Sequence, residues 1–320
     1  MKKVLALFLS FVLTVTVFSG CKAKEPINII IMDDLNSATF VNLIDKTKNG
    51  TAENEYTFTT VYSAQAVTAK ITKGEADVAV VPAFVAASLY NKTDGGMTLL
   101  ALTTSGSISL VTKGEEITKY EDLKGKEIFV SGRGTDTEYM LKYLLLKNGV
   151  TPDTVKVTSV ADDSKLIEKF KHGDAKISVV SEPTKTLLIN NVPDTRTVMG
   201  ITADWNSATN NSGIIQGAIV VREDFLKKNK GKVKKFLKEA ETSVYMASAD
   251  TATTAKLCVT EGIFESEEIA KSVLKNSEIS FVTGNDMKTR FRKSIKALHT
   301  VGMKVMGTKA PGDKFYYNVK

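Results

Sequence analysis

Small polar residues of this chain recur at the points where predicted strands end and helices begin. The turns that contain them contribute the candidate residues Asn36, Ser37, Ser63, Ala64, Pro82, Thr103, Thr104, Gly134 and Thr135. In open α/β sheets, ligands bind beyond the carboxyl ends of the strands, where helix N-termini offer free backbone N–H groups and a positive dipole end. These residues are therefore predicted to bind a small ligand in a cleft between two lobes that close on it.

Three larger side chains could take part in the same binding, and each also has a simpler interpretation. Arg133 could clamp a carboxylate, sulfonate or phosphate, or it could be exposed and pair with solvent or a neighbouring Asp. Glu182 could contact the ligand, or it could cap the helix that Pro183 begins. Trp205 could form a wall of the ligand site, or it could pack inside its lobe.

The sequence contains no recognisable catalytic or metal-binding pattern. His172 and His299 are far apart, and neither lies near a cysteine or carboxylate at the spacing of metal ligands. There is no Gly-x-Ser-x-Gly elbow, and Gly132-Arg133-Gly134 lacks the third glycine of a dinucleotide-binding fingerprint. We therefore expect a binding protein rather than an enzyme, with no catalytic residues, metal or cofactor.

The elements that must position these residues are short β-branched strands alternating with amphipathic helices, a pattern typical of an α/β fold. Strands are expected near residues 27–32, 56–62 and 78–81, and Asn36 or Ser37 is a suitable N-cap for the first helix. Thr135 and Glu138 have the spacing of a capping box for a later helix.

Strands become scarce beyond Arg222, so the last part of the chain is expected to pack back on the first sheet. The predicted domains are therefore a discontinuous first lobe, residues 27–108 and 219–320, and a second lobe, residues 109–218, which includes the hinge crossovers. The mature chain, residues 21–320, is long enough for two domains.

The N-terminal segment resembles a lipoprotein export signal. Met1-Lys2-Lys3 is followed by an apolar run from Val4 to Phe18 and then by Ser19-Gly20-Cys21. We expect residues 1–20 to be a signal peptide, Cys21 to be acylated, and residues 21–26 to tether the protein to the extracytoplasmic side of a bacterial membrane. The alternative is an ordinary signal peptide followed by a chance cysteine.

Charge and cysteine content limit the partners. The net charge of +7 becomes 7 − 2 = +5 once Lys2 and Lys3 leave with the signal. No basic block is interleaved with aromatic residues, so nucleic acid is not an expected partner. Acylation of Cys21 leaves Cys258 without a partner for an intramolecular disulfide. We expect a monomer.

Several segments, taken together, resemble a known family. They are Lys73 to Pro82, Asp122 to Lys126, Gly132 to Thr135 with Glu138-Tyr139, Ser181-Glu182-Pro183, Phe225 to Asn229 with Val233 to Leu237, and Phe315-Tyr316-Tyr317. In this order and spacing they resemble the solute-binding lipoproteins of ABC importers, in the group that includes nitrate, sulfonate, taurine and thiamine-precursor binders.

This resemblance implies a type II periplasmic-binding fold, in which two α/β lobes joined by two crossover segments hold a ligand between them. It also implies that the closed form docks on a membrane permease, which works with an ATPase. The ligand would be a small polar or anionic solute, or a heterocycle. The first turn is Leu35-Asn36-Ser37 where the group often has Gly-Pro-Thr, so the resemblance names no particular substrate.

Other functions remain as alternatives. A pyrimidine-forming enzyme branch of this fold uses a histidine and a cysteine-rich motif, and neither is evident in this sequence. A ligand-sensing or non-transport surface lipoprotein would share the cleft, and permease and ATPase genes next to this one would favour import instead. A structural or adhesive lipoprotein would have no closing cleft.

Overall fold

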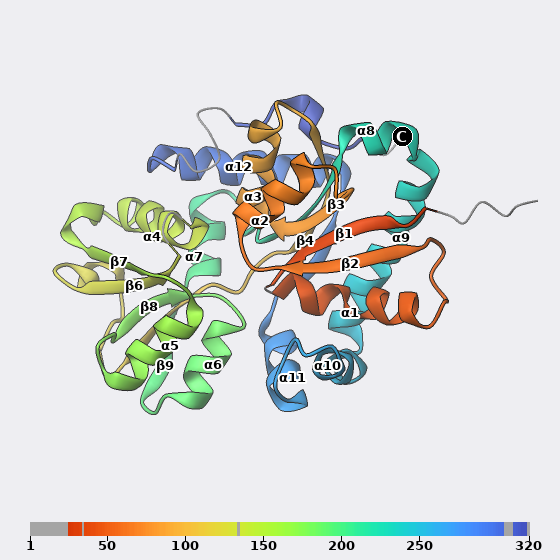
Figure 1. The fold of residues 1–320 in the computed structure, drawn as a ribbon. Helices are drawn as coiled ribbons and strands as arrows, with labels where there is room; N and C mark the ends of the chain where they lie inside the picture. Colours follow the sequence, from red (N-terminus) through yellow and green to blue (C-terminus); the bar gives the residue numbers. More distant parts are fainter. Residues whose placement is uncertain (1–24, 34, 133–134, 304–309, 319–320) are drawn as a thin grey trace, which may run out of the picture.

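The computed structural model describes residues 25–33, 35–132, 135–303 and 310–318. Within these ranges the chain forms two β-sheets with helices on both faces, joined by two short connections (Figure 1). We call the first sheet with its helices the first lobe, and the second sheet with its helices the second lobe. The second lobe, yellow and green at the left of Figure 1, comes from the middle of the chain.

The first sheet has the strand order β11-β4-β10-β3-β1-β2. Its strands are β1 (Ile27–Met32), β2 (Tyr56–Val61), β3 (Val78–Pro82), β4 (Met97–Thr104), β10 (Gly217–Arg222) and β11 (Ile279–Val282). β1 is parallel to β2 and β3, and β10 lies antiparallel between β3 and β4. Segments far apart in the sequence therefore share this sheet.

The second sheet has the order β7-β6-β8-β5-β9. Its strands are β5 (Ser109–Lys113), β6 (Glu127–Ser131), β7 (Lys156–Val160), β8 (Ile177–Val180) and β9 (Thr195–Gly200). β6 is parallel to β7 and β8, and β5 lies antiparallel between β8 and β9. In both sheets the antiparallel inner strand, β5 or β10, is the one that the chain enters after crossing from the other lobe.

Helices of the first lobe cover both faces of its sheet (Figure 1). α1 (Leu35–Lys48) and α9 (Lys230–Ala249) lie on one face, and α2 (Ala64–Thr72), α3 (Ala83–Lys92) and α12 (Gly284–Thr300) lie on the other. α8 (Glu223–Lys228) follows β10, and α10 (Thr251–Thr260) and α11 (Glu267–Asn276) form a pair beside α1. The strand-poor C-terminal part therefore packs on the first lobe.

The second lobe is built in the same way. α4 (Asp136–Lys147) and α7 (Ile201–Ala208) cover one face of its sheet, and α5 (Asp163–His172) and α6 (Thr184–Asn191) cover the other. Short 3₁₀ turns occur at Tyr120–Leu123, Pro152–Thr154 and Asp313–Phe315. α12 also contacts α4, so the two lobes share one continuous apolar cluster at this side.

The buried strands explain the two-faced core. Ile29 and Ile31 join the apolar cluster under α1 and α9, whereas Ile30 joins the cluster under α2 and α3. In β3, Val78 and Val80 likewise face α1 and α9, while Ala79 and Val81 face the opposite side. Successive strand side chains point to opposite faces, so an uninterrupted apolar run suits a strand buried on both.

The structure corrects two predictions about helix capping. α1 begins at Leu35, so Asn36 and Ser37 lie inside its first turn and are not its N-cap. The capping box predicted for α4 is absent, because the Thr135 side chain does not bond to the helix and its Oγ1 donates to the Gly132 carbonyl oxygen at 3.4 Å. Glu138 pairs with Lys142 one turn along the helix.

Candidate ligand-binding site

A cavity of about 220 Å³ lies between the two lobes. The first lobe lines this interlobe cavity with Met32, Leu35, Asn36, Pro82, Phe84 and Thr104. The second lobe lines it with Ser131, Thr135, Asp136, Thr137, Asp163, Val179, Val180, Ser181 and Glu182, and the second crossover adds Gln216.

The cavity lies where strands end and helices start. β1 ends at Met32 and α1 begins at Leu35, and β3 ends at Pro82 and α3 begins at Ala83. On the opposite side, β6 and β8 end next to the cavity and lead into α4 and α6. The strand ends of both lobes thus meet across the gap, as expected for the ligand site of an open α/β sheet.

Close packing holds the polar group of the first lobe in place. The buried Thr103 Oγ1 donates a hydrogen bond of 3.0 Å to Asn36 Oδ1. Gly217 lies against this pair, because a Cβ at position 217 would come within 2.2 Å of both Asn36 Oδ1 and Thr103 Oγ1. A side chain at position 217 would therefore displace Asn36 and Thr103. The glycine at this position lets Asn36 keep its place in the cavity lining.

Asp136, the first residue of α4, contributes a carboxylate from the second lobe. Desolvation by the surrounding protein raises its pKa to about 6, although the Thr137 backbone N–H, which donates to Oδ1 at 3.0 Å, acts in the opposite direction. The charged form of this carboxylate is therefore poorly solvated.

Glu182 is buried, and its position allows both roles considered from the sequence. Its Oε2 accepts a hydrogen bond of 3.2 Å from the Thr186 backbone N–H, so it caps the start of α6, and it also lines the cavity. Its Oε1 lies 2.8 Å from Lys185 Nζ, which in turn donates to Ser107 Oγ of the first crossover at 3.1 Å. These contacts connect the cavity wall to the hinge.

Some of the residues predicted from the sequence come together at the cavity and others do not. Those that line it are Asn36, Pro82, Thr104, Thr135 and Glu182. Those of the described residues that lie outside its lining are Ser37, Ser63, Ala64, Thr103 and Trp205. Arg133 and Gly134 lie outside the described residues, as does Cys21, the predicted acylation site.

Trp205 and Ser63 have structural roles that explain their positions. The Trp205 ring is fully buried against Tyr143, with 5.3 Å between ring centroids, and its Nε1 donates to Ser212 Oγ at 3.1 Å. This favours packing inside the lobe over a wall of the ligand site. Ser63 is the N-cap of α2, and its Oγ accepts the Ala66 backbone N–H at 3.2 Å.

The sequence interpretation missed several lining residues, notably Asp136, Asp163 and Gln216. Asp136 and Asp163 are each the first residue of a helix, α4 and α5. An acidic residue at a helix start is common because it complements the helix dipole. Their position after predicted strands was nevertheless a usable signal, since the first turns of such helices face the carboxyl edge of the sheet.

The described part of the chain has neither a metal-binding cluster nor a membrane-spanning helix. Within it, no group of three or more His, Cys, Asp and Glu side chains is arranged to hold a metal ion. None of its helices has the length and apolar character needed to cross a bilayer.

Comparison with known families gives one match to a family model. The model described as NMT1/THI5 like matches residues 62–252, which is more than half of the chain. No curated protein sequence matches the chain.

Solved structures share the fold at low sequence identity. An ABC transporter protein from Parabacteroides distasonis is 18% identical, with a TM-score of 0.78 over 92% of this chain and 99% of that one. The aliphatic sulphonate binding protein SsuA from Escherichia coli is 12% identical, with a TM-score of 0.69 over 92% and 97% of the two chains. A Candida albicans protein described as having the generic periplasmic binding protein fold is 15% identical, with a TM-score of 0.62 over 90% and 99%.

Proposed function

Because this chain belongs to the NMT1/THI5-like family, we propose that it is the solute-binding protein of an ABC importer. It captures a small polar solute between its two lobes and passes the solute to a membrane permease that works with an ATPase. It binds the solute reversibly and does not convert it. The two-lobed α/β architecture, which matches the periplasmic binding protein fold, supports this proposal.

The observation that carries the proposal is the position of the interlobe cavity. Both lobes and one crossover contribute to its lining, so a ligand there would contact both lobes at once. A ligand that contacts both lobes stabilises the closed arrangement over the open one, and this difference is what a permease can recognise.

The two crossovers support a closing motion. Residues 105–108 connect β4 to β5, and residues 209–216 connect α7 to β10. The second crossover is tied to the first lobe by backbone hydrogen bonds, from Gln216 N to Thr104 O at 3.0 Å and from Ala83 N to Gln216 O at 2.8 Å. Short segments that end at fixed strands are suitable hinges, because few dihedral angles need to change.

We propose that the protein acts outside the cytoplasm, attached to the membrane through acylated Cys21. The support is the Ser19-Gly20-Cys21 sequence after an apolar run. Pro26 precedes β1 directly, so the proposed tether of residues 21–26 would leave the first lobe close to the membrane surface. We propose a monomer.

Reconstitution with a candidate ABC permease and its ATPase tests import against sensing. The purified protein is added to the transporter in nanodiscs, with and without a compound that raises its melting temperature. Import predicts that the loaded protein stimulates ATP hydrolysis more than the empty protein does. A sensing lipoprotein would bind the same compound and leave ATP hydrolysis unchanged.

A further inference from the structure

The charged side chains that line the described part of the interlobe cavity are all acidic. They are Asp136, Asp163 and Glu182, and no lysine, arginine or histidine joins them in that lining. Glu182 is neutralised by Lys185 at 2.8 Å. Asp136 has no ion-pair partner among the described residues, and its Oδ1 accepts the Thr137 backbone N–H. The described part of the lining therefore carries a net negative charge.

These carboxylates occupy the places that an anionic ligand would use. Helix N-termini attract anions through free N–H groups and the helix dipole. Asp136 and Asp163 stand at the first positions of α4 and α5, and Glu182 caps α6. An anion entering the second lobe would meet like charges there, whereas a cation would find counter-charges already oriented by the helices.

Asp136 is the carboxylate that gains most from a cationic ligand. Its solvation is reduced, as its raised pKa indicates, and the described residues supply no cation to compensate it. Asp163 is exposed and keeps its water, and Glu182 already has Lys185. A ligand cation next to Asp136 would restore the missing counter-charge inside a site from which closure expels water.

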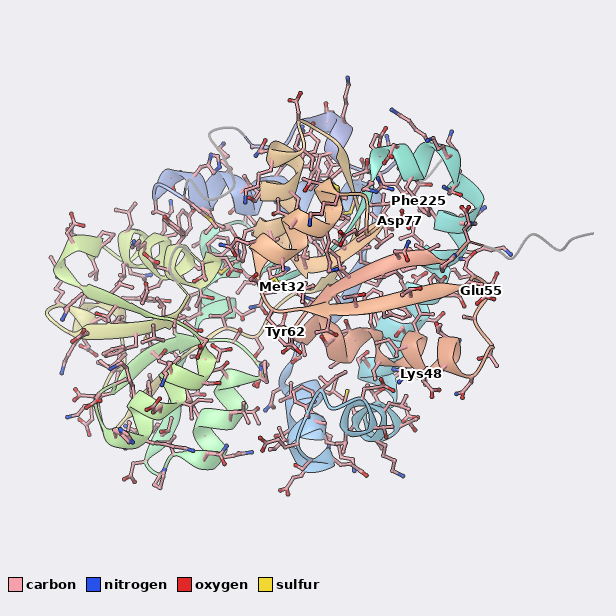
Figure 2. All side chains as sticks on the ribbon, in the orientation of Figure 1. Met32, Lys48, Glu55, Tyr62, Asp77 and Phe225 are labelled. Carbon is pink, nitrogen blue, oxygen red and sulfur yellow. The ribbon has the colours of Figure 1, made fainter. Side chains whose placement is uncertain are left out.

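Apolar and aromatic groups of the first lobe face these carboxylates. Met32 and Phe84 line the cavity, and Tyr62 follows Val61, the residue paired with Met32 in the sheet. Figure 2 shows Met32 and Tyr62 on the edge of the first lobe that faces the second lobe. The Tyr62 side chain is 78% exposed, so its ring is accessible to a ligand.

From these observations we infer that the interlobe cavity takes a small organic cation, with Asp136 as its counter-charge and Tyr62 as an aromatic face that covers it when the lobes close. This inference rests on the proposed function and specifies its ligand class. Organic ammonium groups bind aromatic faces through the ring quadrupole, and a carboxylate nearby adds charge attraction.

The test uses probes that share a shape and differ in charge. One set is choline, its uncharged carbon analogue dimethylbutanol, and the sulfonate isethionate. A second, flat set is benzylammonium, benzyl alcohol and benzoate. Dissociation constants are measured by calorimetry on the processed protein at neutral pH. The inference predicts that in at least one set the cation binds about tenfold or more tightly than both its neutral and its anionic counterparts.

Variants then assign the effect to the named residues. Asp136→Asn should weaken cation binding about tenfold or more, while the same change at the exposed Asp153, in the second lobe but outside the cavity, should leave it unchanged. Tyr62→Ala should weaken cation binding and Tyr62→Phe should keep it. Tyr245→Ala is the matched control, since Tyr245 is 66% exposed on α9.

The outcomes separate this inference from the proposed function. If an anion or a neutral compound binds and no cation binds more tightly, the ligand class is wrong and solute binding stands. The ligand class is equally wrong if Asp136→Asn and Asp153→Asn affect cation binding alike. If no compound of any charge binds, in these sets or in a broad screen, both the inference and the proposed function fail.

Discussion

Gly106 of the first crossover lies directly against Gln216 of the second. A Cβ on Gly106 would come within 2.5 Å of Gln216 Oε1, and the backbone of Gly106 has φ +71°. The two connections between the lobes are therefore in contact, and Gln216 also lines the interlobe cavity. A substitution at Gly106 is therefore expected to alter ligand affinity by moving the Gln216 side chain.

Gly106→Ala should lower both stability and ligand affinity. The positive φ disfavours alanine by about 1 kcal/mol, and the added methyl group must displace the Gln216 side chain from its place in the cavity. Thermal unfolding and calorimetry measure the two effects. Gly114→Ala is the control, because Gly114 has φ +70° and no neighbour within 4 Å. It should lose similar stability and keep its affinity; an equal loss of affinity in both variants would contradict the hinge contact.

Thr103→Val should weaken ligand binding from outside the cavity. The change removes the 3.0 Å hydrogen bond that orients Asn36 Oδ1, and such a bond contributes about 1 kcal/mol to stability. The matched control is Thr98→Val in the same strand, where Thr98 Oγ1 donates to Glu223 Oε2 at 2.6 Å, away from the cavity. Both variants should unfold at lower temperature, but Thr103→Val alone should raise the ligand dissociation constant. Unchanged affinity in Thr103→Val would show that Asn36 does not contact the ligand.

The fold class was predicted correctly from the sequence because its strands leave a strong local signal. Val78 to Val81 form an uninterrupted apolar run, and such a run is typical of a strand with both faces covered. β9 was missed, since Thr195–Gly200 is mostly exposed or half-buried and its residues show no such run. The prediction of a capping box at Thr135 was wrong. The spacing of Thr135 and Glu138 does not determine the backbone conformation before the helix, and this conformation decides whether the Thr135 side chain can bond to the helix.

The candidate site was predictable only in outline. Strand-end positions such as Asn36 and Thr104 reach the cavity because the topology brings strand ends together. Ser63 follows a strand as well, but its side chain is used to cap α2. Gln216 could not be found in this way, since its role depends on contact between crossovers 110 residues apart, Gly106 and Gln216. Such tertiary contacts leave no local pattern in a sequence.

Asp136→Asn should stabilise the protein at neutral pH. Burial raises the pKa of Asp136 to about 6, above the value of an unfolded chain, so the folded state holds its proton more tightly. Stability therefore falls as pH rises from about 4 through about 6, and the charged form costs on the order of 3 kcal/mol above that range. Denaturant unfolding should show a clear gain for the variant at about pH 8 and almost none at about pH 4.

Asp122→Asn is the control with the opposite sign. The Thr118 backbone N–H, and then the Thr118 hydroxyl, lower the pKa of Asp122, so its ionised form favours the folded state. That contribution is present above the unfolded pKa and is lost as pH falls, and the variant should be less stable than the parent at neutral pH. If Asp136→Asn loses stability at neutral pH as Asp122→Asn does, Asp136 does not pay a desolvation cost.

Cys21→Ala should abolish membrane attachment through the lipoprotein route. The thiol of Cys21 is the proposed acylation site, so the variant should be released or keep its signal uncleaved. Cell fractionation and metabolic labelling with a fatty acid measure this. The control is Cys258→Ala, because Cys258 is fully buried and burial raises its pKa to about 12, which makes its thiol unreactive. Labelling that persists in Cys21→Ala would contradict the proposed anchor.

The most direct test of the central claim is a thermal-shift screen with recovery of the compound. The processed protein is incubated with organic cations, sulfonates, nitrate, pyrimidines, flavins and small aromatic acids, and each compound is analysed by mass spectrometry afterwards. Reversible solute binding predicts that at least one compound raises the melting temperature, since a ligand that binds only the folded state must do so, and that it is recovered unchanged. The claim is contradicted if no compound stabilises the protein while one of them is chemically converted by it.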